Sequence, residues 1–146
     1  MSRTGLISSN LLVYKKIFLT SILFLWVCLI TIFSLLPDQK LSIGFLWFQQ
    51  ADKLVHFIFY FGFAFLLLRL LYHSSVKLGR SFLIVAVVIP TVYSGIIELA
   101  QEYLVVSRNA ELLDFFVNML GAIAAVVLGR YFLKLEFSRF YTKEFS

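Results

Sequence analysis

The sequence predicts an all-α, polytopic membrane protein built as a bundle of four transmembrane helices. Hydrophobic residues make up 61% of the 146 residues, against roughly 45–50% in soluble domains. Charged residues make up 14%, against roughly 25% in soluble domains, and the mean hydropathy is +0.93. This length has room for about four membrane helices of roughly 20 residues and short connections. A single membrane domain, residues 1–146, is therefore expected.

The first predicted helix covers residues 17–36, after a short polar lead that ends at Lys15 and Lys16. The run is too long for the apolar core of a signal peptide, and Pro37 ends it. Residues 38–51 hold an apolar stretch that is too short to span a bilayer, with Trp47 suited to the headgroup level. Two interpretations stay open for them, a loop on the membrane surface or a re-entrant flap over a site.

Three further helices are predicted at residues 52–72, 81–103 and 111–133. The last of them is rich in small residues that allow close helix packing. These residues are Gly121, Ala122, Ala124, Ala125 and Gly129. Residues 134–146 alternate Phe and Tyr with charged side chains, which is typical of a basic aromatic tail on an anionic membrane surface. A disordered tail is the alternative.

The basic residues predict the orientation of the helices. Of the 13 Lys and Arg residues, ten flank the membrane on the side of the two termini and of the second connection. Lys40, Lys53 and Arg108 are the three on the other side. Because basic residues favour the cytoplasmic side, both termini are predicted to be cytoplasmic.

Polar side chains gather where the second, third and fourth predicted helices approach the outer surface. Residues at four-residue or three-residue spacing share a helix face, as Asp52, His56 and Tyr60 do. Lipid offers such groups no partner, so these faces are expected to turn inward and converge. The candidate binding site consists of Asp52, Lys53, His56, Tyr60, Glu98, Gln101, Arg108, Asp114 and Asn118.

At these residues the chain resembles the VanZ-like family of bacterial membrane proteins. The matching segments are S-L-L-P at 34–37, D-K-x-x-H-F-x-x-Y at 52–60, E-x-x-Q at 98–101, Arg108, and D-x-x-x-N-x-x-G at 114–121. The resemblance covers a core of about residues 17–133. It implies a multi-pass protein of the bacterial cytoplasmic (inner) membrane that acts in the cell envelope. The family takes its name from a member linked to resistance to the glycopeptide antibiotic teicoplanin, and this does not assign resistance to the present chain.

The favoured function hypothesis is binding of a lipid headgroup or an envelope component at the outer leaflet, because polar residues inside membranes are functional by default. Arg108 and Lys53 would hold a phosphate or carboxylate group, and the other polar residues would hydrogen-bond sugar or peptide groups. The expected partners are membrane lipids or lipid-linked envelope components, and a membrane protein partner stays open. No nucleic-acid partner is expected.

A membrane-embedded enzyme acting on a lipid-linked substrate is the second hypothesis. Glu98 would be its general base, His56 a partner, and Arg108 would stabilise an anionic transition state. Asp52 and Asp114 could imitate an aspartyl pair, although both lie at helix ends. The chain contains no H-E-x-x-H motif, nucleophile elbow or phosphate-binding loop. Binding is therefore favoured over catalysis.

No metal ion or cofactor is expected, since the sequence has no compact ligand motif. If an ion did bind, His56, Glu98 and Asp114 would suit a borderline divalent metal. A purely structural role for the polar residues is the remaining alternative. Interhelical hydrogen bonds average about 0.6 kcal/mol in one well-studied membrane protein, and six or more such groups exceed what packing needs.

Overall fold

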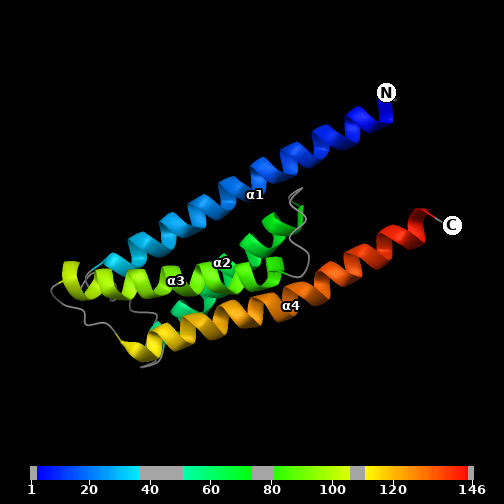
Figure 1. Ribbon diagram of the computed structural model, residues 1–146. Helices are drawn as coiled ribbons and strands as arrows, with labels where there is room; N and C mark the ends of the chain where they lie inside the picture. The colour runs from blue at the N-terminus through cyan, green and yellow to red at the C-terminus, as the bar shows by residue number, and fades with distance from the viewer. Residues whose placement is uncertain (1–2, 37–50, 74–80, 106–110, 145–146) are drawn as a thin grey trace.

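The computed structural model describes residues 3–36, 51–73, 81–105 and 111–144, and the side chains of residues 10–36, 52–73, 81–105 and 111–133. Within these ranges the chain forms four α-helices (Figure 1). They are α1 (Arg3–Leu35), α2 (Ala51–His73), α3 (Ser81–Leu104) and α4 (Leu112–Glu144). Each helix contains a segment long and apolar enough to cross a membrane. The predicted all-α, four-helix membrane fold is confirmed.

The two outer helices are longer than the sequence predicted. Helix α1 begins at Arg3 instead of residue 17, and α4 continues through the expected tail to Glu144. No Pro or Gly interrupts residues 6–35 or 130–144, and the leucine, lysine, arginine and glutamate residues there favour helix. A helix of 33 residues is about 50 Å long, which exceeds the roughly 30 Å of a bilayer's hydrocarbon core. Both helices therefore extend past the membrane-spanning part.

Helix α2 lies at the centre of the bundle, where it packs against the other three helices. Helix α3 also contacts α1 and α4, whereas α1 and α4 make no backbone contact in the described part of the chain. The buried side chains on the α1 side are Ile30, Tyr60, Phe63 and Leu67. On the α3–α4 side they are Leu68, Ala86, Val126 and Leu133.

The approach of α2 to α4 depends on small residues, as predicted. A Cβ atom on Gly121 would lie 2.5 Å from the backbone oxygen of Phe57 and 3.2 Å from the backbone nitrogen of Phe61. Ala64 of α2 and Ala122 of α4 are fully buried in the same contact. Since lipid is as apolar as the side chains, tight packing of this kind is the main source of helix association in membranes.

Helix α1 is attached to α2 and α3 by aromatic and polar contacts. The indole of Trp26 donates a hydrogen bond to the backbone oxygen of Phe59 at 2.9 Å. The ring lies over Gly62, whose missing side chain makes room for it. The hydroxyl groups of Thr31 and Tyr93 are 2.5 Å apart. These contacts position the carboxyl end of α1 beside the ends of the other helices that carry the polar residues.

Candidate functional site

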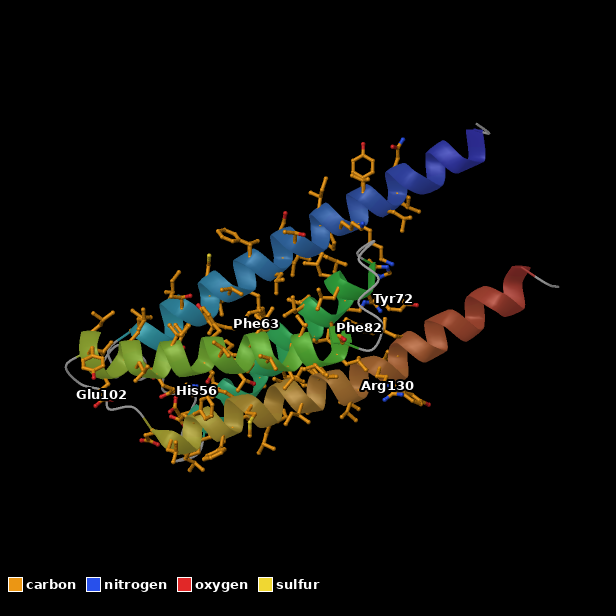
Figure 2. All side chains as sticks on the ribbon, viewed as in Figure 1. His56, Phe63, Tyr72, Phe82, Glu102 and Arg130 are labelled. Carbon is orange, nitrogen blue, oxygen red and sulfur yellow. The ribbon has the colours of Figure 1, made fainter. Side chains whose placement is uncertain are left out.

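Buried polar side chains are concentrated at one end of the bundle, the end opposite the two termini (Figures 1 and 2). Successive helices run in opposite directions, so the ends of α1 and α3 meet the beginnings of α2 and α4. His56 and Glu102 lie at this end and Arg130 towards the other in Figure 2. We call the group the polar cluster. Its members are Ser34, Asp52, Lys53, His56, Tyr60, Ser94, Glu98, Gln101, Glu111, Asp114 and Asn118.

Lys53 joins the first turn of α2 to the beginning of α4. Its ammonium nitrogen lies 3.1 Å from Oε2 of Glu111 and 3.1 Å from Oδ1 of Asp114. The Asp114 side chain is 8% exposed, whereas that of Glu111 is 60% exposed. The pair with Asp114 therefore has the stronger electrostatic effect, because burial removes the screening that weakens surface pairs. Lys53 is already committed to two carboxylates.

His56 lies one turn further along α2 and is 4% exposed. Its Nε2 atom is 3.7 Å from Oδ1 of Asp52 and 4.0 Å from Oδ2 of Asp114. Both separations are too long for hydrogen bonds. The other ring nitrogen, Nδ1, is buried and has no hydrogen-bond partner among the described residues.

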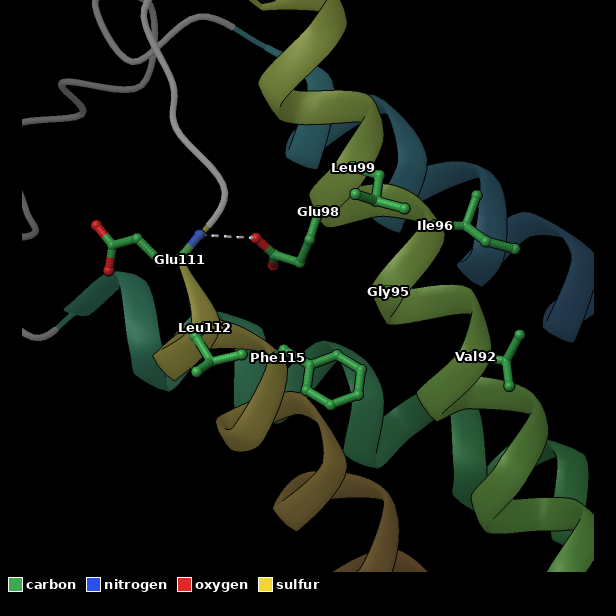
Figure 3. Close-up of a pocket in the computed structure, with 8 residues that line it drawn as sticks. All are labelled: Val92, Gly95, Ile96, Glu98, Leu99, Glu111, Leu112 and Phe115. Carbon is green, nitrogen blue, oxygen red and sulfur yellow. Dashed lines mark hydrogen bonds between the residues drawn. The ribbon is translucent and has the colours of Figure 1, made fainter.

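Glu98 of α3 lies at the amino-terminal end of α4. Its Oε2 atom accepts a hydrogen bond of 3.4 Å from the backbone N–H of Glu111 (Figure 3). The backbone oxygen of Glu111 in turn accepts from the N–H groups of Asp114 and Phe115 in the first turn. A carboxylate in this position satisfies a donor that the helix itself leaves open and interacts favourably with the helix dipole. Glu98 thus stabilises the amino-terminal end of α4 and is also a member of the polar cluster.

The deepest polar contact of the cluster joins α3 to α4. The side-chain amide of Asn118 donates to the hydroxyl of Ser94 at 2.8 Å, and both residues are buried. The hydroxyl of Tyr60 approaches Ser94, but the geometry is not that of a hydrogen bond, and this buried hydroxyl has no other partner in the described ranges. The Oδ1 atom of Asn118 is also buried without a partner there. Two polar atoms at this depth therefore stay available to a water molecule or a ligand.

Gln101 attaches α1 to the cluster. Its side-chain amide donates a 2.7 Å hydrogen bond to the backbone oxygen of Ser34, and both residues are buried. Ser34 belongs to the S-L-L-P segment that was singled out in the sequence. In the structure Ser34 and Leu35 form the carboxyl end of α1, whose last carbonyl groups need donors from outside the helix.

The structure places eight of the nine candidate site residues at one end of the bundle, where the printed contacts join Lys53 and His56 to Asp114, Asn118 to Ser94, and Gln101 to Ser34. The ninth candidate, Arg108, lies outside the described residues. The expected proximity of Arg108 to Glu98 and Asp114 therefore stays a prediction. The flap or surface loop expected at residues 38–51 also stays a prediction, because residues 38–50 lie outside the described part of the chain. Ser34, Ser94 and Glu111 are additional members of the cluster that the list of candidates omitted. The S-L-L-P segment was a signal for Ser34, and the three- and four-residue spacing that links Ser94, Glu98 and Gln101 was a signal for Ser94. Glu111 had only its position at a helix start to indicate it.

A groove of about 560 Å³ opens between α3 and α4 beside the cluster (Figure 3). Its walls are apolar, and its polar end is formed by Glu98 and Glu111. The apolar lining residues are Val92, Gly95, Ile96, Leu99, Leu112 and Phe115. Several of them are more than half exposed, Val92 at 57% and Leu112 at 73% among them. In a membrane, such side chains contact lipid.

No protein-family model, curated protein or solved structure matches this chain.

Proposed function

We propose that the chain is a VanZ-like protein of the bacterial cytoplasmic membrane that binds a lipid or lipid-linked envelope component at the outer leaflet. The observation that carries this proposal is the apolar groove between α3 and α4, which ends at Glu98 and Glu111. An amphipathic ligand matches such a site, because its hydrocarbon chain fits the apolar walls and its head meets the polar end. The ordered motifs that resemble the VanZ-like family support the assignment of the bacterial envelope.

The charges of the cluster indicate which kind of head fits. Lys53 is paired with Glu111 and Asp114, so it is not available for a phosphate as the sequence suggested. The described cluster contains four carboxylates, on Asp52, Glu98, Glu111 and Asp114, and Lys53 is its single Lys or Arg residue. These residues accept hydrogen bonds. We therefore infer a head that donates them, such as a sugar hydroxyl or an amine.

Lipid binding is tested by native mass spectrometry of the delipidated chain with defined lipids. The probes are phosphatidylethanolamine, phosphatidylglycerol and an isoprenoid-linked sugar. We expect saturable binding that favours a donor-bearing head, and a loss of at least about tenfold, or 1.4 kcal/mol, in Val92→Trp, which fills the groove. Val88→Trp is the control, because Val88 lies one turn earlier on α3, is 47% exposed and does not line the groove. Equal binding by the two tryptophan variants would contradict the proposal.

A structural role for the cluster is separated from binding by Glu98→Gln. The glutamine keeps an oxygen that can accept from Glu111, so we expect the free energy of unfolding to change by less than about 1 kcal/mol. Binding of the preferred lipid should nevertheless fall, since the carboxylate at the end of the groove is lost. A large drop in thermal stability with unchanged lipid binding would show that Glu98 mainly holds the helices together.

A further inference from the structure

Asp52, His56 and Asp114 bring one nitrogen and two carboxylates towards a common point. Potential ligand atoms of the three residues all lie within 4.8 Å of one another. Two donor atoms that bind one ion at about 2.0–2.2 Å are at most about 4.4 Å apart. The separations of His56 Nε2 from Asp52 and Asp114, 3.7 Å and 4.0 Å, already fall within that limit.

The imidazole of His56 is the feature that distinguishes this group from an ordinary acidic helix end. It is 6% exposed, and it faces two carboxylates without a hydrogen bond to either. Buried polar groups are nearly always satisfied in native structures, and an ion is one of the partners that explains an exception. The ring nitrogen that lacks any partner among the described residues is Nδ1. Nε2 is the nitrogen that faces the two carboxylates, at 3.7 Å and 4.0 Å, and is the atom that a metal ion between the ring and the carboxylates would bind.

The two oxygens of Asp114 have different surroundings. Oδ1 accepts from Lys53, whereas Oδ2 faces His56. One carboxylate can thus be oriented by Lys53 and still offer an oxygen to an ion, which is the usual arrangement of a ligating carboxylate with its hydrogen-bonded neighbour. The Asp52 side chain is 56% exposed and leaves the site open to the surface.

We propose that Asp52, His56 and Asp114 form a binding site for a divalent first-row transition-metal ion of the zinc class. A single imidazole with two carboxylates suits a borderline divalent ion better than the all-oxygen sites of magnesium or calcium. Three protein ligands leave a further coordination position for water or for a ligand oxygen. Glu98, which the sequence placed among the possible metal ligands, does not belong to this group. The site is additional to the lipid groove and does not depend on it.

The test uses the full chain, without an affinity tag, in detergent. Equilibrium dialysis against Zn²⁺ should show saturable binding of one ion per chain that an equal concentration of Mg²⁺ does not displace, and Co²⁺ should give visible absorption bands when it binds. His56→Gln should weaken the affinity for Zn²⁺ at least about tenfold and abolish the bands. His73→Gln, at the other end of α2, is the matched control and should bind like the unaltered chain. Absence of saturable binding, or unchanged binding by His56→Gln, would overturn the proposal.

Asp52→Asn keeps the proposal testable if the buried His56 variant does not fold. Because the Asp52 side chain is largely exposed, this variant should fold and still bind Zn²⁺ at least about tenfold more weakly. Glu102→Gln changes another exposed carboxylate at the same end and should leave the affinity unchanged. Equal affinity in the two variants would mean that surface carboxylates alone attract the ion, which refutes the site. Lipid binding measured with a chelator present is expected to persist, so failure of either proposal can be recognised separately.

Discussion

At the scale of single residues, the ionic contacts of Lys53 govern the charge balance of the polar cluster. The ammonium group lies between Glu111 and Asp114, and Asp114 is almost fully shielded from solvent. Removing one member of such a pair leaves the other as an uncompensated buried charge, which costs more than the pair itself contributes. Lys53 should therefore be more important for stability than its partly exposed position suggests.

We expect Lys53→Met to lower the free energy of unfolding by about 1–3 kcal/mol, because the buried carboxylate of Asp114 loses its donor. Unfolding of the purified chain in mixed detergent micelles, followed by circular dichroism, measures the change. The double variant with Asp114→Asn is the control. It should be more stable than Lys53→Met alone, since the stranded charge is removed. A double variant that is less stable than the single one would show that Asp114 acts independently of Lys53.

The residue pattern predicted most members of the polar cluster but not which side chains form ion pairs or hydrogen bonds with each other. Spacing of four residues placed Asp52, His56 and Tyr60 on one face of a helix, and the structure buries His56 and Tyr60 while Asp52, at the start of that face, stays largely exposed. The spacing did not predict the ion pair between Lys53 and Glu111, because these residues are 58 positions apart in the sequence, one on α2 and the other directly before α4. Periodicity identifies a face, whereas partners on another helix depend on the relative rotation of the two helices.

At the scale of the elements, the contact between α2 and α4 depends on where the backbones come closest. At Gly121 the two helices are so near that a methyl group has no space, since its position would be 2.5 Å from a backbone oxygen of α2. Backbone atoms cannot rotate away as a side chain does. This crossing also determines the separation of Lys53 and His56 on α2 from Asp114 on α4.

Gly121→Ala should lower the free energy of unfolding by about 1–3 kcal/mol, as expected for overpacking of a tight contact. The thermal midpoint of the chain in detergent reports the change. Gly95→Ala is the matched control, because the nearest atom to its added methyl group is a Phe115 ring carbon at an ordinary 3.5 Å. That variant should be neutral or slightly stabilising, by up to about 1 kcal/mol, since alanine favours helix over glycine. Equal effects of the two substitutions would refute the close approach at Gly121.

Element boundaries were the weakest part of the sequence prediction. The hydropathy pattern marks the lipid-contacting part of a helix, and it found those parts of α1 and α4. It cannot mark the end of a helix that continues into the aqueous region, because polar residues such as Lys15 and Lys16 are as compatible with helix as apolar ones. The predicted ends of α2 and α3 agree with the structure within one residue.

At the scale of the whole molecule, the alternation of four helices places both termini at one end and the polar cluster at the other (Figure 1). An even number of spans places both termini on the same side, whichever way the protein faces, and the buried polar residues lie at the end away from them. The distribution of Lys and Arg then predicts that the end with the termini is cytoplasmic. The polar cluster would accordingly face the outer leaflet, where the proposed lipid ligand is available.

Cysteine labelling tests this orientation. In a Cys28→Ser background, Glu102→Cys should react with a membrane-impermeant thiol reagent in intact cells, whereas Arg130→Cys should react only after the membrane is disrupted. Both positions are exposed and lie towards opposite ends of the bundle (Figure 2). The reverse pattern would show that the polar cluster faces the cytoplasm. If both cysteine variants reacted in intact cells, the two ends of the bundle could not lie on opposite sides of the membrane.

The sequence by itself determined the class of protein, the four spanning segments and the end of the bundle at which polar groups gather. These properties follow from the hydropathy of each segment and from the alternating direction of successive helices. Hydropathy and helix order can both be determined from the order of residues in the sequence. Only the tertiary structure decided which polar groups meet. Lys53 joins Glu111 and Asp114, His56 faces two carboxylates, and a groove opens between α3 and α4. The physical reason is that the rotation and separation of two helices depend on close contacts between them, such as the one at Gly121. The residue pattern along a single helix does not specify such contacts.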